Sequence, residues 1–120
     1  MAKKIAEQLI DTLVKSGVER IYAVTGDSLN EVNEAVRKND QIKWIHVRHE
    51  ETGAYAAAAE AQLTGRPGCC AGSSGPGHVH LINGLYDAHH VYANCCRWIG
   101  LSGLLPNIYK GRIQRICMQP

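Results

Sequence analysis

Apolar residues recur along the chain at spacings that alternate between those of helices and those of strands. Residues 3–16 place their apolar side chains on one helical face, and Gly17 follows as a stop signal. Short runs rich in β-branched residues predict strands between such helices. The predicted helices cover residues 3–16, 28–36, 49–63 and 78–89, and the predicted strands cover 20–25, 42–47 and 68–71.

This order, in which strands alternate with helices, predicts an α/β fold with a mostly parallel, doubly wound sheet that has helices on both faces. In such sheets, ligands bind beyond the carboxyl ends of the strands. Three predicted loops leave those ends: Thr25–Ser28, Arg48–Glu51 and Gly72–Gly77. We therefore expect the chemistry of the protein in these loops.

Two helices carry further local signals. Ser28 and Glu31 have the spacing of a capping box, which predicts that the second helix begins at Ser28. The last predicted helix has an apolar set that we expect to face the core, namely Val79, Leu81, Ile82, Leu85 and Tyr86.

Composition and charge exclude several classes of protein. The 120 residues fit one domain, and 45% apolar residues suffice for a packed core. A net charge of +2 does not suggest nucleic-acid binding. The longest apolar stretch, Ala54–Ala59, is far shorter than the roughly 20 residues that cross a membrane. Five cysteines, an odd number, follow no signal peptide, which indicates a reducing, cytoplasmic location.

Two of the three loops carry candidate chemistry, each with a plain structural alternative. Arg48–Glu51 either caps a helix or holds a partly buried glutamate that exchanges a proton with a ligand nitrogen. Gly72–Gly77 is either a tight turn or a loop whose backbone lies against a flat ligand.

The histidines do not indicate a metal site. His78 and His80 point apart on a helix, and the adjacent His89 and His90 diverge as well. Gly53 stands where the second histidine of an H-E-x-x-H zinc motif would be. The sequence therefore predicts no metal ligands.

Taken together, these motifs resemble the pyrimidine-binding domain of thiamine-diphosphate enzymes. The resemblance covers roughly residues 3–91 and is carried by four segments: Thr25–Asn30, Val47–Glu51, Ala56–Gly65 and Gly72–Ala88. It is strongest to the pyruvate oxidase and quinone-dependent pyruvate dehydrogenase branch, with acetolactate synthase as a more distant relative.

The resemblance implies roles for individual residues. Glu50 is the implied catalytic residue, which hydrogen-bonds N1′ of the cofactor's aminopyrimidine, and a poorly solvated carboxyl group suits that contact. Glu51 is expected only to cap or pack. The implied cofactor-binding residues are Val24, Thr25, Gly26, Glu50, Ser74, Gly75, Pro76, Gly77, His80 and Asn83.

The resemblance also implies the wider setting of the domain. Members of the branch oxidatively decarboxylate pyruvate as dimers or tetramers and carry FAD and Mg²⁺ on other domains. This chain would hold only the pyrimidine half of thiamine diphosphate, so we expect no turnover by the chain alone. The alternatives are an acetolactate synthase-like enzyme, a non-catalytic interaction or regulatory domain of the same fold, and polyanion binding by the basic tail.

The family pattern is lost after Val91. The pattern requires proline and an apolar strand there, whereas residues 92–100 include Asn94 and Arg97, which a central parallel strand disfavours. No acidic residue follows Asp87. We therefore divide the chain into an incomplete pyrimidine-binding domain, residues 1–91, and an aberrant tail, residues 92–120. Codons read one base later from Tyr92 permit Met or Thr, then Pro-Ile-Val-Val-Ala-Gly, which suggests a frame shift.

Sequencing the source gene on both sides of the Tyr92 codon tests this hypothesis. The expected result is a shifted frame that continues into an apolar strand and later a Gly-Asp-Gly motif. A read-verified, in-frame tail shared by close relatives would contradict the frame shift and favour a free-standing domain.

Overall fold

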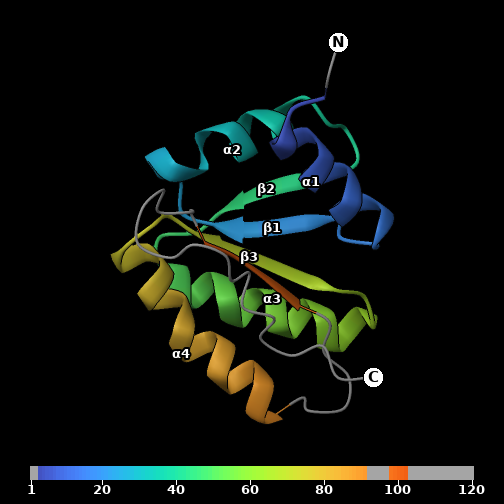
Figure 1. Ribbon diagram of the computed structural model, residues 1–120. Helices are drawn as coiled ribbons and strands as arrows, with labels where there is room; N and C mark the ends of the chain where they lie inside the picture. Colours follow the sequence, from blue (N-terminus) through green and yellow to red (C-terminus); the bar gives the residue numbers. More distant parts are fainter. Residues whose placement is uncertain (1–2, 92–97, 103–120) are drawn as a thin grey trace.

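The computed structural model describes residues 3–91 and 98–102, with side chains described for residues 3–90 (Figure 1). All seven predicted helices and strands are present. The elements are α1 (Ile5–Lys15), β1 (Arg20–Ala23), a short 3₁₀ helix η1 (Asp27–Leu29), α2 (Asn30–Arg37), β2 (Lys43–His46), α3 (Glu50–Thr64), β3 (Gly68–Gly72), α4 (Pro76–Val91) and β4 (Trp98–Ser102).

The strands form one parallel sheet in the order β2-β1-β3-β4. Tyr22 of β1 is in register with Ile45 of β2 on one side and with Cys70 of β3 on the other. Helices α1 and α2 cover one face of the sheet, and α3 and α4 cover the other (Figure 1). The predicted doubly wound α/β fold is thereby confirmed.

Strand β3 separates two apolar cores. All five of its residues are buried, with Cys69 and Ala71 in the core beneath α1 and α2 and Cys70 in the core beneath α3 and α4. A strand buried on both faces favours an uninterrupted run of small apolar residues. The second core consists of Ala54, Ala57, Ala58, Cys70, Leu81, Leu85 and Ala88.

Small residues bring the backbones of this second layer unusually close together. A Cβ atom added to Gly68 of β3 would lie 2.0 Å from the carbonyl oxygen of Ala57 in α3. A Cβ added to Gly84 of α4 would lie 2.7 Å from the Cβ of Ala54. Glycine is therefore required at both positions, because any larger residue would push α3 away from its neighbours.

The predicted capping box at Ser28 is wrong. Ser28 lies in η1, and α2 begins at Asn30 without a side-chain cap. The carboxylate of Glu31 instead accepts from Nζ of Lys4 at 3.0 Å, and Oγ of Ser28 accepts from the backbone N–H of Ser74 at 2.9 Å. Ser28 and Glu31 therefore bind other segments of the chain instead of capping α2.

Residues 92–100 were not expected to form a central strand, and β4 (Trp98–Ser102) lies at the edge of the described sheet, beside β3. It pairs in parallel with the whole length of β3, from Gly68 to Gly72. Backbone hydrogen bonding to the open edge of β3 is available to any side-chain pattern. The proposed tail otherwise lies outside the described residues, in 92–97 and 103–120.

The apolar set expected on α4 is only partly buried. Leu81 and Leu85 are in the core, whereas Val79, Ile82 and Tyr86 are 59%, 53% and 70% exposed. These three residues form a stripe on the outer side of the helix, at spacings of three and four residues. Within the described part of the chain, no helix has the length and apolarity needed to cross a membrane.

Burial of the two cysteines of β3 predicts low thiol reactivity. Desolvation raises the pKa of Cys70 to about 12 and the pKa of Cys69 well above its usual value. Because the thiolate is the nucleophile, iodoacetamide at pH 8 should alkylate both residues only after denaturation. Unfolded thiols ionise at about pH 8.5, whereas the buried thiols stay protonated. The folded state therefore loses stability relative to the unfolded state as the pH rises above about 8.5.

Peptide mass spectrometry after timed labelling measures this reactivity residue by residue. Labelling of Cys70 in native buffer as fast as in urea would contradict the burial of β3.

Candidate functional site

The three loops at the carboxyl ends of β1, β2 and β3 lie together, as the sequence predicts. The loop after β3 contacts the loop after β1 twice: Ser74 donates its N–H to Ser28, and a Cβ on Gly26 would lie 2.5 Å from the Cβ of Ser73. It also contacts the start of α3, because a Cβ on Gly77 would lie 2.9 Å from Oε1 of Glu50. These contacts bring residues of all three loops together.

Among the residues that the structure describes, Glu50 is the charged residue that is buried. It is the first residue of α3, and its side chain is 11% exposed. The positive end of the helix dipole favours a carboxylate there. Oε2 lies 3.1 Å from Nδ1 of His80, and Oε1 faces Gly77. The structure thus places three of the predicted site residues in direct proximity.

His49 has a structural and a positional role that the sequence analysis missed. As the N-cap of α3, it accepts the backbone N–H of Glu51 on its Nδ1 at 3.3 Å. Its ring stacks on the ring of His80, with centroids 4.7 Å apart and an interplanar angle of 26°. The capping interpretation of this loop is confirmed for His49, while the carboxylate of Glu50 points elsewhere. The adjacent histidine and glutamate at a strand-to-helix junction were the available signal.

Asn83 contacts the second glutamate of the loop instead of the first. Its Nδ2 donates to Oε1 of Glu51 at 2.9 Å and so connects α4 to the first turn of α3. Burial and the neighbouring Glu51 carboxylate raise the pKa of Tyr55. Glu51 thus has the packing role that was expected of it, and the described hydrogen bond of Asn83 goes to Glu51 and not to Glu50.

The turn into α4 depends on two glycines and a proline. Gly75 has a φ of +79°, which glycine adopts readily, and its carbonyl accepts the N–H groups of His78 and Val79. Pro76 then occupies the first helical position, where a missing N–H costs nothing. Gly77 is buried, and its missing side chain leaves room for the Glu50 carboxylate.

The residues predicted after β1 contact the loop that follows β3 through Gly26. Val24 is half-buried, Thr25 is exposed, and Gly26 packs against Ser73. No hydrogen bond joins these three residues to Glu50 or His80 among the described contacts. The structure therefore places them near the turn after β3, separate from the contacts of the carboxylate.

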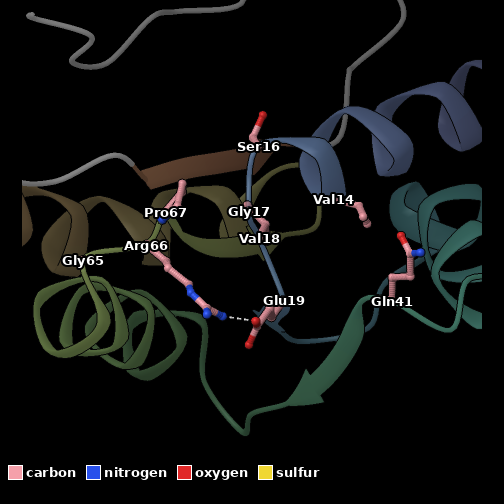
Figure 2. Close-up of a pocket in the computed structure, with 9 residues that line it drawn as sticks. All are labelled: Val14, Ser16, Gly17, Val18, Glu19, Gln41, Gly65, Arg66 and Pro67. Carbon is pink, nitrogen blue, oxygen red and sulfur yellow. Dashed lines mark hydrogen bonds and ion pairs between the residues drawn. The ribbon is translucent and has the colours of Figure 1, made fainter.

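A groove of about 670 Å³ lies at the opposite, amino ends of the strands (Figure 2). It is lined by residues that precede β1, β2 and β3, including Gly17, Gln41 and Pro67. Its two charged side chains, Glu19 and Arg66, form an ion pair with each other. The groove contains none of the predicted site residues and offers no unpaired acid or base, so the loops at the carboxyl ends remain the candidate site.

Comparisons with known proteins identify the family. Residues 3–113 match the family described as thiamine pyrophosphate enzyme, N-terminal TPP binding domain. A 42.6 kDa protein of the isoamylase 3′ region of Pseudomonas amyloderamosa is 57% identical over 86 residues, which are 72% of this chain and 22% of that protein. Pyruvate oxidase of Lactiplantibacillus plantarum is 47% identical over 96 residues, 79% of this chain and 16% of the relative.

Chloroplastic acetolactate synthase of Arabidopsis thaliana is 37% identical over 86 residues, 72% of this chain and 13% of the synthase. The chain therefore spans between 13% and 22% of the length of these three relatives. The match to the family extends over most of the chain and includes every residue of the site. The chain belongs to the thiamine pyrophosphate enzyme family, as its N-terminal TPP binding domain.

Proposed function

We propose that this chain holds the aminopyrimidine ring of thiamine diphosphate and supplies Glu50 as the acid–base residue of a pyruvate-decarboxylating oxidoreductase. The observation that carries the proposal is the Glu50 carboxylate, which is buried where three loops meet and faces Gly77 and His80. A buried charge without a full set of partners is costly, so a buried carboxylate with one side-chain partner at a loop junction points to a ligand.

The residues present fit an aminopyrimidine. An ionised carboxylate has about four lone-pair positions, and His80 occupies one of them. The remaining positions can accept a hydrogen bond from a ring nitrogen that carries a proton. Beside the carboxylate, Gly75 and Gly77 carry no side chain, which lets a flat ring approach their backbone closely.

When bound, thiamine diphosphate would supply the electron sink for decarboxylation. The chain would contribute binding, orientation and one proton position. Glu50 would hold a proton at N1′ of the ring, and His80 would fix the direction of that carboxylate. Val24–Gly26 and Ser74–Gly77 would border the ring, and Asn83 would position α4 through Glu51.

Pyruvate oxidation is preferred to acetolactate synthesis because the identity to pyruvate oxidase, 47%, exceeds that to acetolactate synthase, 37%. We accordingly propose pyruvate as the substrate of the whole protein, with FAD and Mg²⁺ on its other domains. A cytoplasmic dimer or tetramer is the proposed assembly. The isolated chain is proposed to bind the pyrimidine without turning over substrate.

Replacing Glu50 by Gln tests the assigned contact directly. The probe is 4-amino-2-methylpyrimidine, followed by amide chemical shifts of Gly75 and Gly77 in the 120-residue chain. Glu50→Gln removes a charge-assisted hydrogen bond and should weaken binding at least about tenfold. The matched control, Glu60→Gln, lies near the far end of α3 and should leave the affinity unchanged. Equal affinity in wild type and Glu50→Gln would refute the assignment.

A chimera extends this test to catalysis. Residues 3–91 replace the corresponding segment of the Lactiplantibacillus plantarum pyruvate oxidase, and pyruvate-dependent turnover is measured. Glu50→Gln in the chimera should lower kcat by about 10²–10⁴, the usual contribution of a positioned acid–base group. An active chimera that is insensitive to Glu50→Gln would exclude a catalytic role for this residue.

Alanine at Gly77 should damage the site more than the fold. Its Cβ would lie 2.8 Å from Oγ of Ser73 and 2.9 Å from Oε1 of Glu50, and both atoms can move aside. Binding of the pyrimidine should therefore fall, with little change in the unfolding midpoint. Gly68→Ala is the matched contrast: its Cβ would strike the backbone of Ala57, which costs about 1–3 kcal/mol of stability. Urea unfolding of both variants measures this, and an equal loss of stability would contradict the described packing.

A further inference from the structure

His49, Glu50 and His80 form a cluster with the composition of a metal site. Each offers one ligand atom, and the three atoms lie within 4.8 Å of one another. The residues come from the N-cap and first position of α3 and from the first turns of α4. Two imidazoles and one carboxylate are a donor set that suits Zn²⁺ and similar divalent transition metals.

We propose that this cluster binds a zinc-type divalent cation through His49, Glu50 and His80, and that the cation and the aminopyrimidine exclude each other. The exclusion rests on the proposed function, because both ligands would use the Glu50 carboxylate. Metal binding itself rests only on the cluster. The sequence analysis predicted no metal ligands because it considered the histidines of the last helix among themselves, without His49.

His80 is oriented for ligation before any metal arrives. Its Nδ1 lies 3.1 Å from Oε2 of Glu50, close to the separation of two ligand atoms on one metal ion, so Nδ1 and Oε2 can bind the same cation when the ring proton is on Nε2. The other ring nitrogen, Nε2, then carries the proton and can donate it to water, in keeping with metal-bound histidines, which donate from the nitrogen that does not ligate. The side chain is 46% exposed, which gives an ion access to it.

His49 must lose its hydrogen bond from the backbone N–H of Glu51 in order to bind a metal ion. Its Nδ1 accepts the backbone N–H of Glu51 over 3.3 Å, beyond the usual range for such bonds. A metal on Nδ1 would replace that donor, and a metal on Nε2 would move the ring proton to Nδ1. Either route loses one weak hydrogen bond at the start of α3. The affinity of the site is therefore linked to the stability of the first turn of α3.

The cluster needs only a small contraction to reach coordination geometry. Bonds of about 2.0–2.2 Å in a tetrahedral site place ligand atoms roughly 3.3–3.5 Å apart. The ligand atoms of the cluster lie within 4.8 Å, and both histidines are exposed and can rotate. The stacked rings already project from neighbouring positions on α3 and α4, which keeps the required movement local.

Cobalt(II) titration of the 120-residue chain, followed by displacement with Zn²⁺, tests the proposal. The background carries Cys95→Ser, Cys96→Ser and Cys117→Ser, because thiolates outside the described residues could bind zinc themselves. We expect one equivalent of metal without a sulfur-to-cobalt charge-transfer band. His49→Gln and His80→Gln should each weaken binding at least tenfold, whereas His90→Gln, an exposed histidine in the last turn of α4, should not.

Circular dichroism confirms the fold of each variant, and His80→Asn repeats the test if His80→Gln is unfolded. Undiminished binding in folded His49→Gln and His80→Gln would overturn the proposal. Adding 4-amino-2-methylpyrimidine should raise the apparent metal Kd, and an unchanged Kd at saturating pyrimidine would overturn the mutual exclusion. If the pyrimidine does not bind at all while cobalt does, the proposed function fails and the metal site stands.

Discussion

Helix α3 and strand β3 meet without a side chain between them at Gly68, and the arrangement of the site depends on this contact. The hydrogen that Gly68 carries in place of a Cβ is all that fits against the carbonyl oxygen of Ala57. Ala54, Ala57, Ala58 and Ala61 extend the same close approach along the buried side of α3. Because none of these groups is flexible, α3 cannot move over the sheet without a clash or a void.

The start of α3 is held in place in the same way. Glu50 is the first residue of the helix and therefore sits at a defined height above the carboxyl end of the sheet. Helix α4 packs on α3 through Gly84, which brings His80 over Oε2 of Glu50 and Gly77 over Oε1. The small residues thus control a polar contact that none of them makes. A rigid support of this kind holds functional groups better than loops alone can.

Two opposing influences act on the Glu50 carboxylate. The helix dipole and His80 stabilise a negative charge, whereas burial beside Gly77 reduces its contact with water. A group held between these influences interacts strongly with an approaching cation or proton donor. A protonated ring nitrogen and a divalent metal meet this same requirement, which places both proposals at one carboxylate. The chain covers only a small part of the length of its relatives.

Much of this architecture could be predicted from residue order alone. Apolar periodicity predicted seven elements, their alternation predicted the parallel sheet, and the topology placed three loops at one end. Those inferences concern neighbours in the chain, where spacing determines which side chains share a face. The sequence also indicated Glu50 as the residue to examine, because its loop lies at the end of a strand and resembles the corresponding motif of thiamine-diphosphate enzymes.

Only the tertiary structure decided which groups meet. Asn83 contacts Glu51 and His80 contacts Glu50, although the two donors lie on one helix only three residues apart. Oγ of Ser28 binds the backbone N–H of a residue 46 positions away instead of capping α2. Three apolar residues of α4 face outward. These outcomes depend on how α4 is rotated about its axis and how closely the backbones approach. Both are decided by packing between distant segments, which local periodicity does not encode.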